Sequence, residues 1–300
     1  MALGVAVTAW RLWPSGNAAT LPAPPAAAAS SPPVAVRPKP HARRPVRLLA
    51  VRGPLAGRVP IGGRAGILVD AGSGTVLWVK RPHLRLPIAS TTKIMTAVVA
   101  LDHLRRNEVV VVDPSATRVQ PFKEGLRAHE RVPAWKLFYG LLLYSGNDDA
   151  VALAVAAGGT WAHFVALMNQ KARQLGLRDT YFRSVSGLVD RGNYSTAWDM
   201  AALARYAMWN RRFREVVGTR IKRVRWAAPT YAKVYVNHNH LLGSYPGADG
   251  IKTGWTTVAQ HCLVASAHRQ GVRLIAVVLD SPNADADARK LLSYGFRSLG

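Results

Sequence analysis

The sequence predicts an α+β fold in which an antiparallel sheet is flanked by helices, with a helical subdomain beside it. Two observations support this prediction. Two β-rich runs open the globular part, helical runs follow, β-rich runs return beyond residue 220, and a helix closes the chain. This order lacks the regular strand–helix alternation of a parallel sheet, so it favours an antiparallel sheet whose first and last strands come together.

The individual elements follow from the spacing of apolar residues. Two β-rich runs at 65–70 and 75–80 flank Ala71-Gly72-Ser73-Gly74, which is typical of a hairpin turn. Apolar residues recur at helical spacing after Ser90, and Thr160 and Ser195-Thr196 stand where helix N-caps are expected. We therefore predict helices at 90–104, 133–144, 148–157, 160–175, 197–209 and 285–299, and further strands at 234–236, 261–267 and 272–279.

The composition is that of a folded and strongly basic protein. Of the 300 residues, 49% are hydrophobic, which excludes a wholly disordered chain. Lysine and arginine number 40 against 16 aspartates and glutamates, so the net charge is +24. A solvated basic surface explains this charge, and an anionic envelope polymer or membrane surface is a further candidate partner. Basic residues do not interleave with aromatic ones as in nucleic-acid modules, so no nucleic-acid partner is expected. Cys262 stands alone, which excludes an internal disulfide.

Residues 1–62 differ from the rest of the chain. They contain no Asp or Glu and are rich in Pro, Ala and Arg, a composition that cannot bury a core. The apolar start, residues 1–13, is too short to span a membrane and is typical of the remnant of a secretion signal or signal anchor. A disordered tail of an intracellular protein has the same composition. We expect a linker over residues 1–62 and one globular domain over residues 63–300.

The first of three segments suited to catalysis lies at the start of a predicted helix. Ser90 precedes Lys93 by three residues, so both side chains share one helix face. A serine hydroxyl needs a base to become a good nucleophile, and a lysine amine serves if desolvation or a nearby cation lowers its pKa. An exposed cap serine beside an exposed lysine would give the same pattern.

The other two segments lie further along the chain. Ser145 and Asn147 flank a glycine between two predicted helices, where a tight turn would project both toward a cleft. Lys252 and Thr253 supply a cation and a hydroxyl suited to a carboxylate, and Gly254 permits close approach of another backbone or a ligand. Taken singly, these segments are also explained as an ordinary helix connection and a strand edge.

In this order, the three segments resemble the motif set of the serine D-alanyl-D-alanine carboxypeptidases, the low-molecular-mass penicillin-binding proteins. The resemblance extends over residues 65–300, and the family segments are matched at 86–97, 141–148, 195–201 and 237–242. It implies a β-lactamase/transpeptidase-like fold and a catalytic domain over residues 63–300. It also implies a peptidoglycan stem pentapeptide as substrate, β-lactams as covalent inhibitors, no cofactor or metal, and an extracytoplasmic location.

The resemblance also implies roles for the reacting residues. Ser90 would attack the carbonyl between the two terminal D-alanines, and Lys93 would be its general base. Ser145 would help to relay a proton to the departing D-alanine. The backbone N–H groups of Ser90 and Trp255 would form the oxyanion hole.

The remaining matched positions would bind the substrate. Asn147 would hold the peptide backbone of the substrate. Lys252 and Thr253 would bind its terminal carboxylate, and Gly254 and Trp255 would complete this strand of the site.

Two alternatives use the same fold. A class A-like β-lactamase would need a deacylating glutamate, commonly within Glu-x-x-x-Asn, and none of the four glutamates has Asn four residues later. A non-catalytic basic protein that binds envelope polymer or nucleic acid would show scrambled motif residues, which this chain does not. Rapid turnover of penicillin would favour the first alternative. Salt-dependent nucleic-acid binding without acylation of Ser90 would favour the second.

Overall fold

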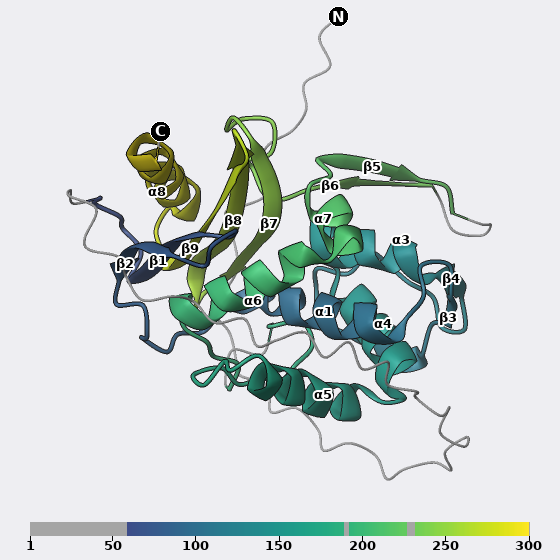
Figure 1. The fold of residues 1–300 in the computed structure, drawn as a ribbon. Coiled ribbons are helices and arrows are strands. Elements are labelled where there is room, and N and C mark those ends of the chain that lie inside the picture. The colour runs from purple at the N-terminus through teal and green to yellow at the C-terminus, as the bar shows by residue number, and fades with distance from the viewer. Residues whose placement is uncertain (1–58, 189–191, 227–231, 300) are drawn as a thin grey trace, which may run out of the picture. The chain divides into compact units, whose positions relative to one another are not determined.

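The computed structural model describes residues 59–188, 192–226 and 232–299. Its five-stranded antiparallel sheet has the order β2-β1-β9-β8-β7 (Figure 1). The strands are β1 (Ala65–Asp70), β2 (Val76–Lys80), β7 (Ala248–Thr256), β8 (Gln260–Arg269) and β9 (Val272–Ser281). Because β1 pairs with β9, the predicted meeting of the first and last strands is confirmed.

Helices and two short ribbons complete the described chain. The α-helices are α1 (Lys93–His103), α2 (Pro114–Thr117), α3 (Ala134–Tyr139), α4 (Asn147–Gly158), α5 (Trp161–Gln174), α6 (Ala197–Trp209), α7 (Arg211–Val217) and α8 (Ala284–Leu299). A 3₁₀ turn, η1 (Ala89–Thr92), precedes α1, and a π-helical turn, η2 (Gly140–Tyr144), follows α3. The two antiparallel ribbons are β3 (Val109–Val111) with β4 (Arg131–Pro133), and β5 (Ile221–Val224) with β6 (Lys233–Val236).

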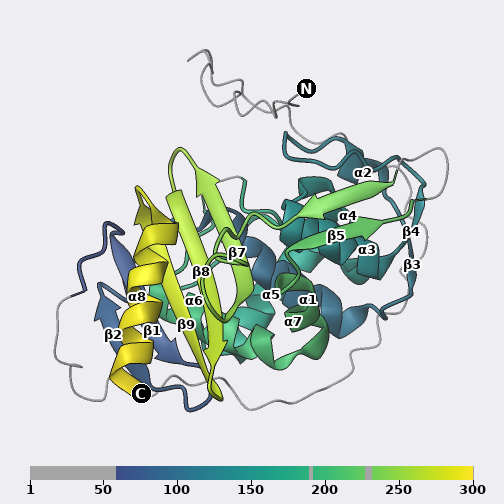
Figure 2. The ribbon, with the colours of Figure 1, turned by 90° about the horizontal axis from the view of Figure 1, so that it is seen from above.

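Both faces of the sheet are covered, as Figures 1 and 2 show. Strand side chains alternate between the two faces. In β1, Leu68 packs in one apolar cluster with Leu291 and Leu292 of α8, whereas Ile67 and Val69 join the larger cluster formed with the other helices. The sheet therefore separates α8 from the helical part of the molecule. The predicted α+β arrangement of helices around an antiparallel sheet is confirmed.

Most predicted elements agree with the structure to within a few residues, and two caps are confirmed. Thr160 Oγ1 accepts a hydrogen bond from the His163 N–H, and Thr196 Oγ1 accepts one from the Asp199 N–H, both at 3.1 Å. Each threonine satisfies an N–H group that the first helical turn leaves free. The helix predicted at 197–209 has those bounds.

One predicted helix, over residues 133–144, is wrong as a single element. Pro133 ends β4, where it pairs with Val109, so α3 begins one residue later. From Gly140 the helix widens into the π-helical turn, which brings this glycine against the carboxyl group of Asp149. A Cβ at position 140 would lie 2.3 Å from Asp149 Oδ1, so the wide turn makes room for this buried carboxyl group. The spacing of apolar residues in the sequence does not indicate it. The predicted motifs at 145–147 therefore follow a π-helical turn rather than a regular helix.

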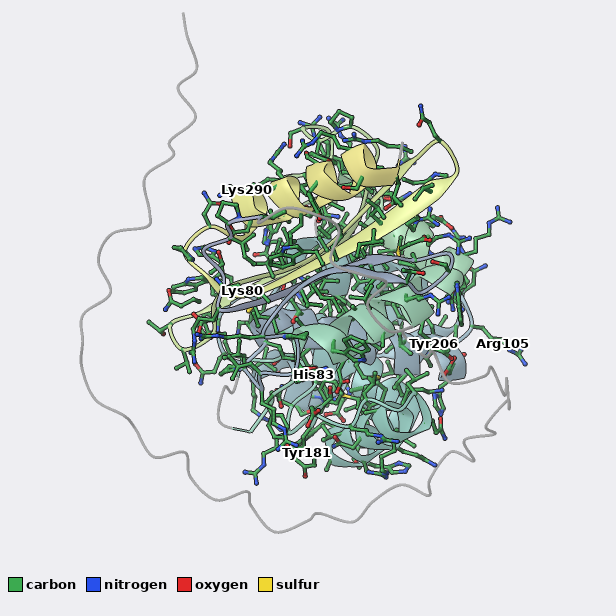
Figure 3. All side chains as sticks on the ribbon, turned by 60° about the vertical axis from the view of Figure 1, so that its left-hand side comes forward. Lys80, His83, Arg105, Tyr181, Tyr206 and Lys290 are labelled. Atoms are coloured by element: carbon green, nitrogen blue, oxygen red, sulfur yellow. The ribbon has the colours of Figure 1, made fainter. Side chains whose placement is uncertain are left out.

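The first described residues are bound to the sheet and to α8. Asp287 accepts hydrogen bonds from the N–H groups of Gly62 and Gly63 at 3.0 and 2.9 Å. Lys80 and Lys290 donate to backbone carbonyls in the same segment, and Figure 3 shows both lysines on the side of the sheet and α8. The predicted linker lies outside the described residues except for 59–62.

Among the described residues, no single helix is both long and apolar enough to cross a membrane. The pair α4 and α5 meets that requirement by length and composition when taken together, with a bend of 83° between the two helices.

Candidate active site

Ser90 lies on a sharp turn between the sheet and α1. Ala89 has a left-handed backbone, with φ of 46°, and η1 then leads directly into the helix. The Thr91 hydroxyl donates to the Ile88 carbonyl at 2.5 Å, which holds the turn from within. Gly187 packs against the turn from outside, since a Cβ there would lie 1.9 Å from the Ala89 carbonyl oxygen. Ser90 is therefore fixed by contacts on both sides and stays half-buried.

Lys93, at the first position of α1, is fully buried and hydrogen-bonded. Its Nζ donates to Ser90 Oγ at 3.1 Å, to Asn147 Oδ1 at 2.8 Å and to the Ser186 carbonyl at 3.1 Å. An ammonium group has three donors, so these three acceptors account for all of them. The structure thus brings the predicted Ser90, Lys93 and Asn147 into one hydrogen-bonded group.

The surroundings of Lys93 favour its neutral form. Burial lowers the pKa of the Lys93 ammonium well below its ordinary value, and the positive charge of Lys252 lowers it further. Asp149 and Asp148 oppose this shift by raising the pKa. A neutral amine 3.1 Å from a serine hydroxyl can accept the hydroxyl proton. The Lys93 amine is therefore placed where a base for the Ser90 hydroxyl is needed.

The second predicted element is held by a neighbouring loop. Asp148 accepts hydrogen bonds from three successive N–H groups, those of Glu124, Gly125 and Leu126, at 2.8–3.0 Å. The same loop supplies the Pro121 carbonyl, which accepts from Asn147 Nδ2 at 2.8 Å. Both ends of the Asn147 amide are therefore engaged within the protein.

Ser145 lies at the junction between η2 and α4, two residues before Asn147. It is 9% exposed and has a left-handed backbone, with φ of 71°. The next residue, Gly146, has the Asp149 carboxyl group where a side chain would be, since a Cβ would lie 2.0 Å from Asp149 Oδ2. Burial, followed by the charges of Glu124 and Asp148, raises the pKa of Asp149 well above its ordinary value. The tight junction predicted from a glycine between Ser145 and Asn147 is present.

The third predicted element forms the edge strand β7, which lies against the Ser90 turn. A Cβ at Gly254 would lie 2.9 Å from the Ser90 nitrogen and 3.1 Å from the Thr91 nitrogen. The close backbone approach predicted for this glycine is therefore confirmed. Trp255 follows it, with 44% of its surface exposed, and faces His261 of β8 across the strand pair.

Lys252 is as deeply buried as Lys93 but has fewer partners. It is 1% exposed, and its Nζ donates to the Thr253 carbonyl at 3.0 Å. Burial lowers the pKa of Lys252 to about 7. Thr253 itself is half-buried on the same strand.

Two contributors to this site are missed by the sequence reasoning. The Ser186 carbonyl accepts from Lys93, and only the glycine beside it hints at a tight turn in the sequence. The second is His238. Its backbone N–H donates to the Leu143 carbonyl at 3.3 Å. Its side chain is exposed by surface area, but neighbouring groups desolvate the ring and, with the charge of Lys252, lower its pKa to about 4. His238 therefore lies in the electrostatic field of Lys252 and Lys93, within a segment matched to the family.

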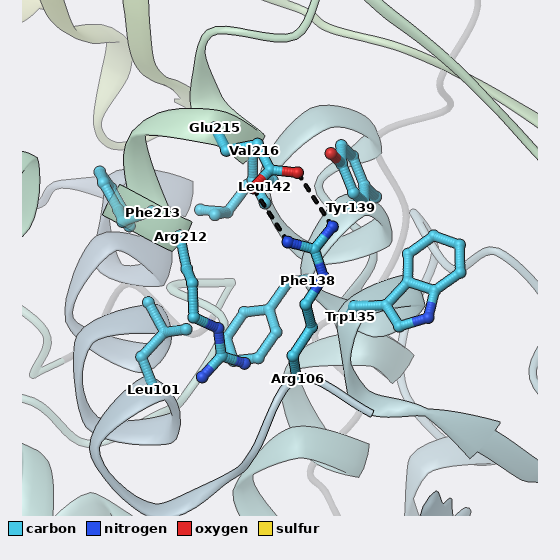
Figure 4. Close-up of a pocket in the computed structure, with 10 residues that line it drawn as sticks. All are labelled: Leu101, Arg106, Trp135, Phe138, Tyr139, Leu142, Arg212, Phe213, Glu215 and Val216. Atoms are coloured by element: carbon cyan, nitrogen blue, oxygen red, sulfur yellow. Dashed lines mark hydrogen bonds and ion pairs between the residues drawn. The ribbon is translucent and has the colours of Figure 1, made fainter. Parts of the chain in front are cut away.

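A separate pocket lies at the other end of α1 and does not contain these groups. Figure 4 shows it lined by Leu101 and by aromatic residues of α3, with Arg106 paired to Glu215 at 3.0 Å. Across residues 59–188, 192–226 and 232–299, no three His, Cys, Asp or Glu side chains gather into a metal site.

Comparisons with known proteins identify the family of this chain. The profile of peptidase family S11, D-alanyl-D-alanine carboxypeptidase, matches residues 56–283. The D-alanyl-D-alanine carboxypeptidase DacF of Bacillus subtilis is 34% identical over 242 residues, which are 78% of this chain and 62% of that protein. The D-alanyl-D-alanine carboxypeptidase of Streptomyces sp. strain K15 is 37% identical over 250 residues, which are 77% of this chain and 86% of that protein. The chain thus spans less than two thirds of the Bacillus relative.

Solved structures show the same fold. A penicillin-binding protein homologue from Mycobacterium tuberculosis superposes with a TM-score of 0.76 at 34% identity, covering 82% of this chain and 96% of that one. The Streptomyces K15 DD-transpeptidase gives a TM-score of 0.74 at 34% identity, covering 79% and 98%. The predicted penicillin-binding-protein fold is therefore confirmed, and this chain belongs to the D-alanyl-D-alanine carboxypeptidase family.

Proposed function

We propose that this protein is a serine-type D-alanyl-D-alanine carboxypeptidase. It removes the terminal D-alanine from peptidoglycan stem pentapeptides through an acyl-enzyme, and β-lactams acylate the same serine. The observation that carries this proposal is the 3.1 Å bond from the buried Lys93 amine to Ser90 Oγ, with Gly254 of β7 against the Ser90 backbone. The family and the names of its relatives support the substrate class.

The first half of the reaction forms the acyl-enzyme. Ser90 Oγ bonds to the carbonyl carbon between the two D-alanines while its proton passes to Lys93 Nζ. The negative charge on the carbonyl oxygen is accepted by the N–H groups of Ser90 and Trp255. The C–N bond then breaks, and the departing amine of D-alanine receives a proton relayed through Ser145. Water hydrolyses the Ser90 ester in the second half, and the free hydroxyl returns.

The two lysines have different targets, since Lys93 acts on Ser90 and Lys252 acts on the substrate. Lys252 and Thr253 bind the terminal carboxylate, and the buried setting of Lys252 strengthens that attraction because little water screens it. Asn147 positions Lys93 through its Oδ1. Contact between Asn147 and the peptide backbone of the substrate would require its bond to Lys93 or to Pro121 to open.

The glutamates argue against the β-lactamase alternative. Glu124 forms an ion pair with Lys233 at 3.3 Å, and Glu215 pairs with Arg106. Glu130 accepts from the indole of Trp226, and Glu108 accepts from the Arg105 N–H. Each is thus engaged outside the Ser90 and Lys93 group. A slowly hydrolysed penicilloyl adduct, rather than rapid turnover, is the expected result.

We further propose an extracytoplasmic location against an anionic envelope. The net charge of +24 and the acid-free segment 1–62 support this proposal, since both favour attraction to anionic polymers and membranes. Fractionation of cells should find the protein with the envelope. Recovery of the full-length protein in the cytoplasm would contradict the location and leave the chemistry intact.

The catalytic proposal is tested with Ser90→Ala and a pentapeptide that ends in D-Ala-D-Ala. Release of D-alanine should fall to background, whereas Ser298→Ala on α8, whose hydroxyl bonds its own helix at Tyr294, should retain it. Release that persists in Ser90→Ala would overturn the assignment of the nucleophile.

A further inference from the structure

The β5–β6 ribbon has two unlike faces. Its register pairs Lys222 with Tyr235 and Val224 with Lys233 on the inner face. Tyr235 and Val224 are buried there, and Lys222 Nζ lies 5.0 Å from the ring centre of Tyr139 in α3. The inner face is therefore part of the helical side of the molecule, along which the ribbon runs in Figures 1 and 2.

The outer face presents aliphatic and cationic side chains together. Ile221 pairs with Val236, and Arg223 pairs with Val234, so the four side chains form two adjacent rows. Ile221, Val234 and Val236 are 52%, 57% and 52% exposed, and Arg223 is exposed beside them. Arg225, two residues further along the chain, is also exposed. We call these five residues the ribbon face.

The charge on the ribbon face is of one sign. Residues 216–248 contain five lysines and arginines and no aspartate or glutamate. Two acidic side chains contact residues of this segment and are engaged there, Glu124 with Lys233 and Glu130 with Trp226. Among the described residues, Arg223 and Arg225 form no ion pair. The ribbon face therefore combines an apolar patch with cations that are available to an anionic partner.

We propose that the ribbon face docks the protein on an anionic phospholipid bilayer. Its three aliphatic side chains enter the interfacial region, and the two arginines bind lipid phosphates. This inference rests on the envelope location proposed above and adds the surface that makes the contact. A soluble anionic polymer would use the arginines but would leave the aliphatic side chains in water. A second copy of this chain would bring the same cations against one another.

The ribbon face lies close to the active site along the chain. After β6 the chain continues through Asn237 to His238, whose N–H donates to the Leu143 carbonyl just before Ser145. One end of the ribbon is thus connected to the active site by two residues. Docking would hold the active site near the lipid surface.

A second ribbon provides a matched control. Val109 and Val111 of β3 are 47% and 49% exposed, close to the values on the ribbon face. Arg131 pairs with Val111 across this ribbon, and Glu108, Glu130 and Asp113 lie close by in the sequence, so this surface combines aliphatic side chains with charges of both signs. Substitutions there remove similar apolar area at a site that the proposal leaves outside the contact.

The experiment is sedimentation of the full-length protein with phosphatidylglycerol–phosphatidylcholine vesicles and with phosphatidylcholine vesicles. Arg223→Gln with Arg225→Gln should weaken binding to the anionic vesicles by about 30-fold, since each basic residue contributes about a factor of five. Val234→Ser with Val236→Ser should weaken it by roughly 3- to 10-fold. Val109→Ser with Val111→Ser should leave it unchanged, and phosphatidylcholine vesicles should bind weakly.

Penicillin labelling at the wild-type rate in every variant would show that the variants fold and that docking is separate from catalysis. The proposal is overturned if the ribbon-face variants bind anionic vesicles like the wild type, or if the β3 control weakens binding as much. It is also overturned if a soluble poly(glycerol phosphate) competes fully and the valine substitutions have no effect, because that result assigns the cations to a polymer.

Discussion

Helix α1 and strand β7, which meet at the Ser90 turn, each bury a lysine, and the two lysines differ in what they contact. Lys93 donates to three acceptors within the protein, whereas Lys252 donates to the carbonyl of its own neighbour, Thr253. Lys93 thus has a complete set of internal partners, one of them the Ser90 hydroxyl. Lys252 keeps donor capacity for a group that arrives from outside.

This difference separates two tasks that a single cation could not perform well. A base must lose its proton before the reaction, and the charge of Lys252 helps to lower the pKa of Lys93 for that purpose. A carboxylate-binding group must keep its proton, and an arriving carboxylate would raise its pKa. In the proposed reaction, the binding of substrate at Lys252 would therefore favour protonation there while Lys93 accepts the proton of Ser90.

The largest expected effect comes from removing the base. Lys93→Met keeps the stem volume but removes the amine, so acylation by penicillin and release of D-alanine should both fall by about 10³-fold or more. Stopped-flow or quenched labelling measures the first rate. A loss confined to the peptide substrate, with normal penicillin acylation, would contradict the role assigned to Lys93.

A smaller and more selective effect is expected for Lys252 on β7. Lys252→Met should lower kcat/KM for a substrate with a terminal carboxylate by roughly 10- to 100-fold, the worth of a charge-assisted hydrogen bond. The same peptide with a C-terminal amide should lose much less. Equal losses for the two peptides would show that Lys252 does not bind the carboxylate.

The smallest effect, and the one that compares both lysines at once, is the pH dependence of kcat/KM. As pH falls, Lys93 becomes protonated and the rate should fall by about tenfold per pH unit. As pH rises through about 7, the pKa of Lys252, this residue loses its charge and the rate should also fall. The amide substrate should keep the acidic limb and lose the alkaline one. An alkaline limb shared by both substrates would assign it to another group.

The parts of this site that the sequence predicts are those set by local geometry. Ser90 and Lys93 meet because they are three residues apart at a helix start, and Gly254 marks a close backbone approach because a strand interior has little other use for glycine. The left-handed backbone of Ala89 and the contact of Lys93 with the Ser186 carbonyl depend on chain segments about a hundred residues apart. No periodicity encodes such contacts.

The fold likewise has parts that the local sequence pattern predicts and parts that tertiary contacts determine. The order of elements and the pairing of β1 with β9 follow from alternation and helical spacing. The π-helical turn at 140–144 and the β5–β6 ribbon depend on tertiary packing, the first around the Asp149 carboxyl group and the second on α3. Strand β5 contains Lys222 and Arg223 between apolar residues, a pattern too short and too polar to indicate a strand.

The most direct test is mass spectrometry of the penicillin-treated protein, with the modified residue located by peptide mapping. We expect one penicilloyl group per chain, on the peptide that contains Ser90. An adduct on Ser145 or on Ser186, or no adduct on an intact and folded protein, would contradict the account.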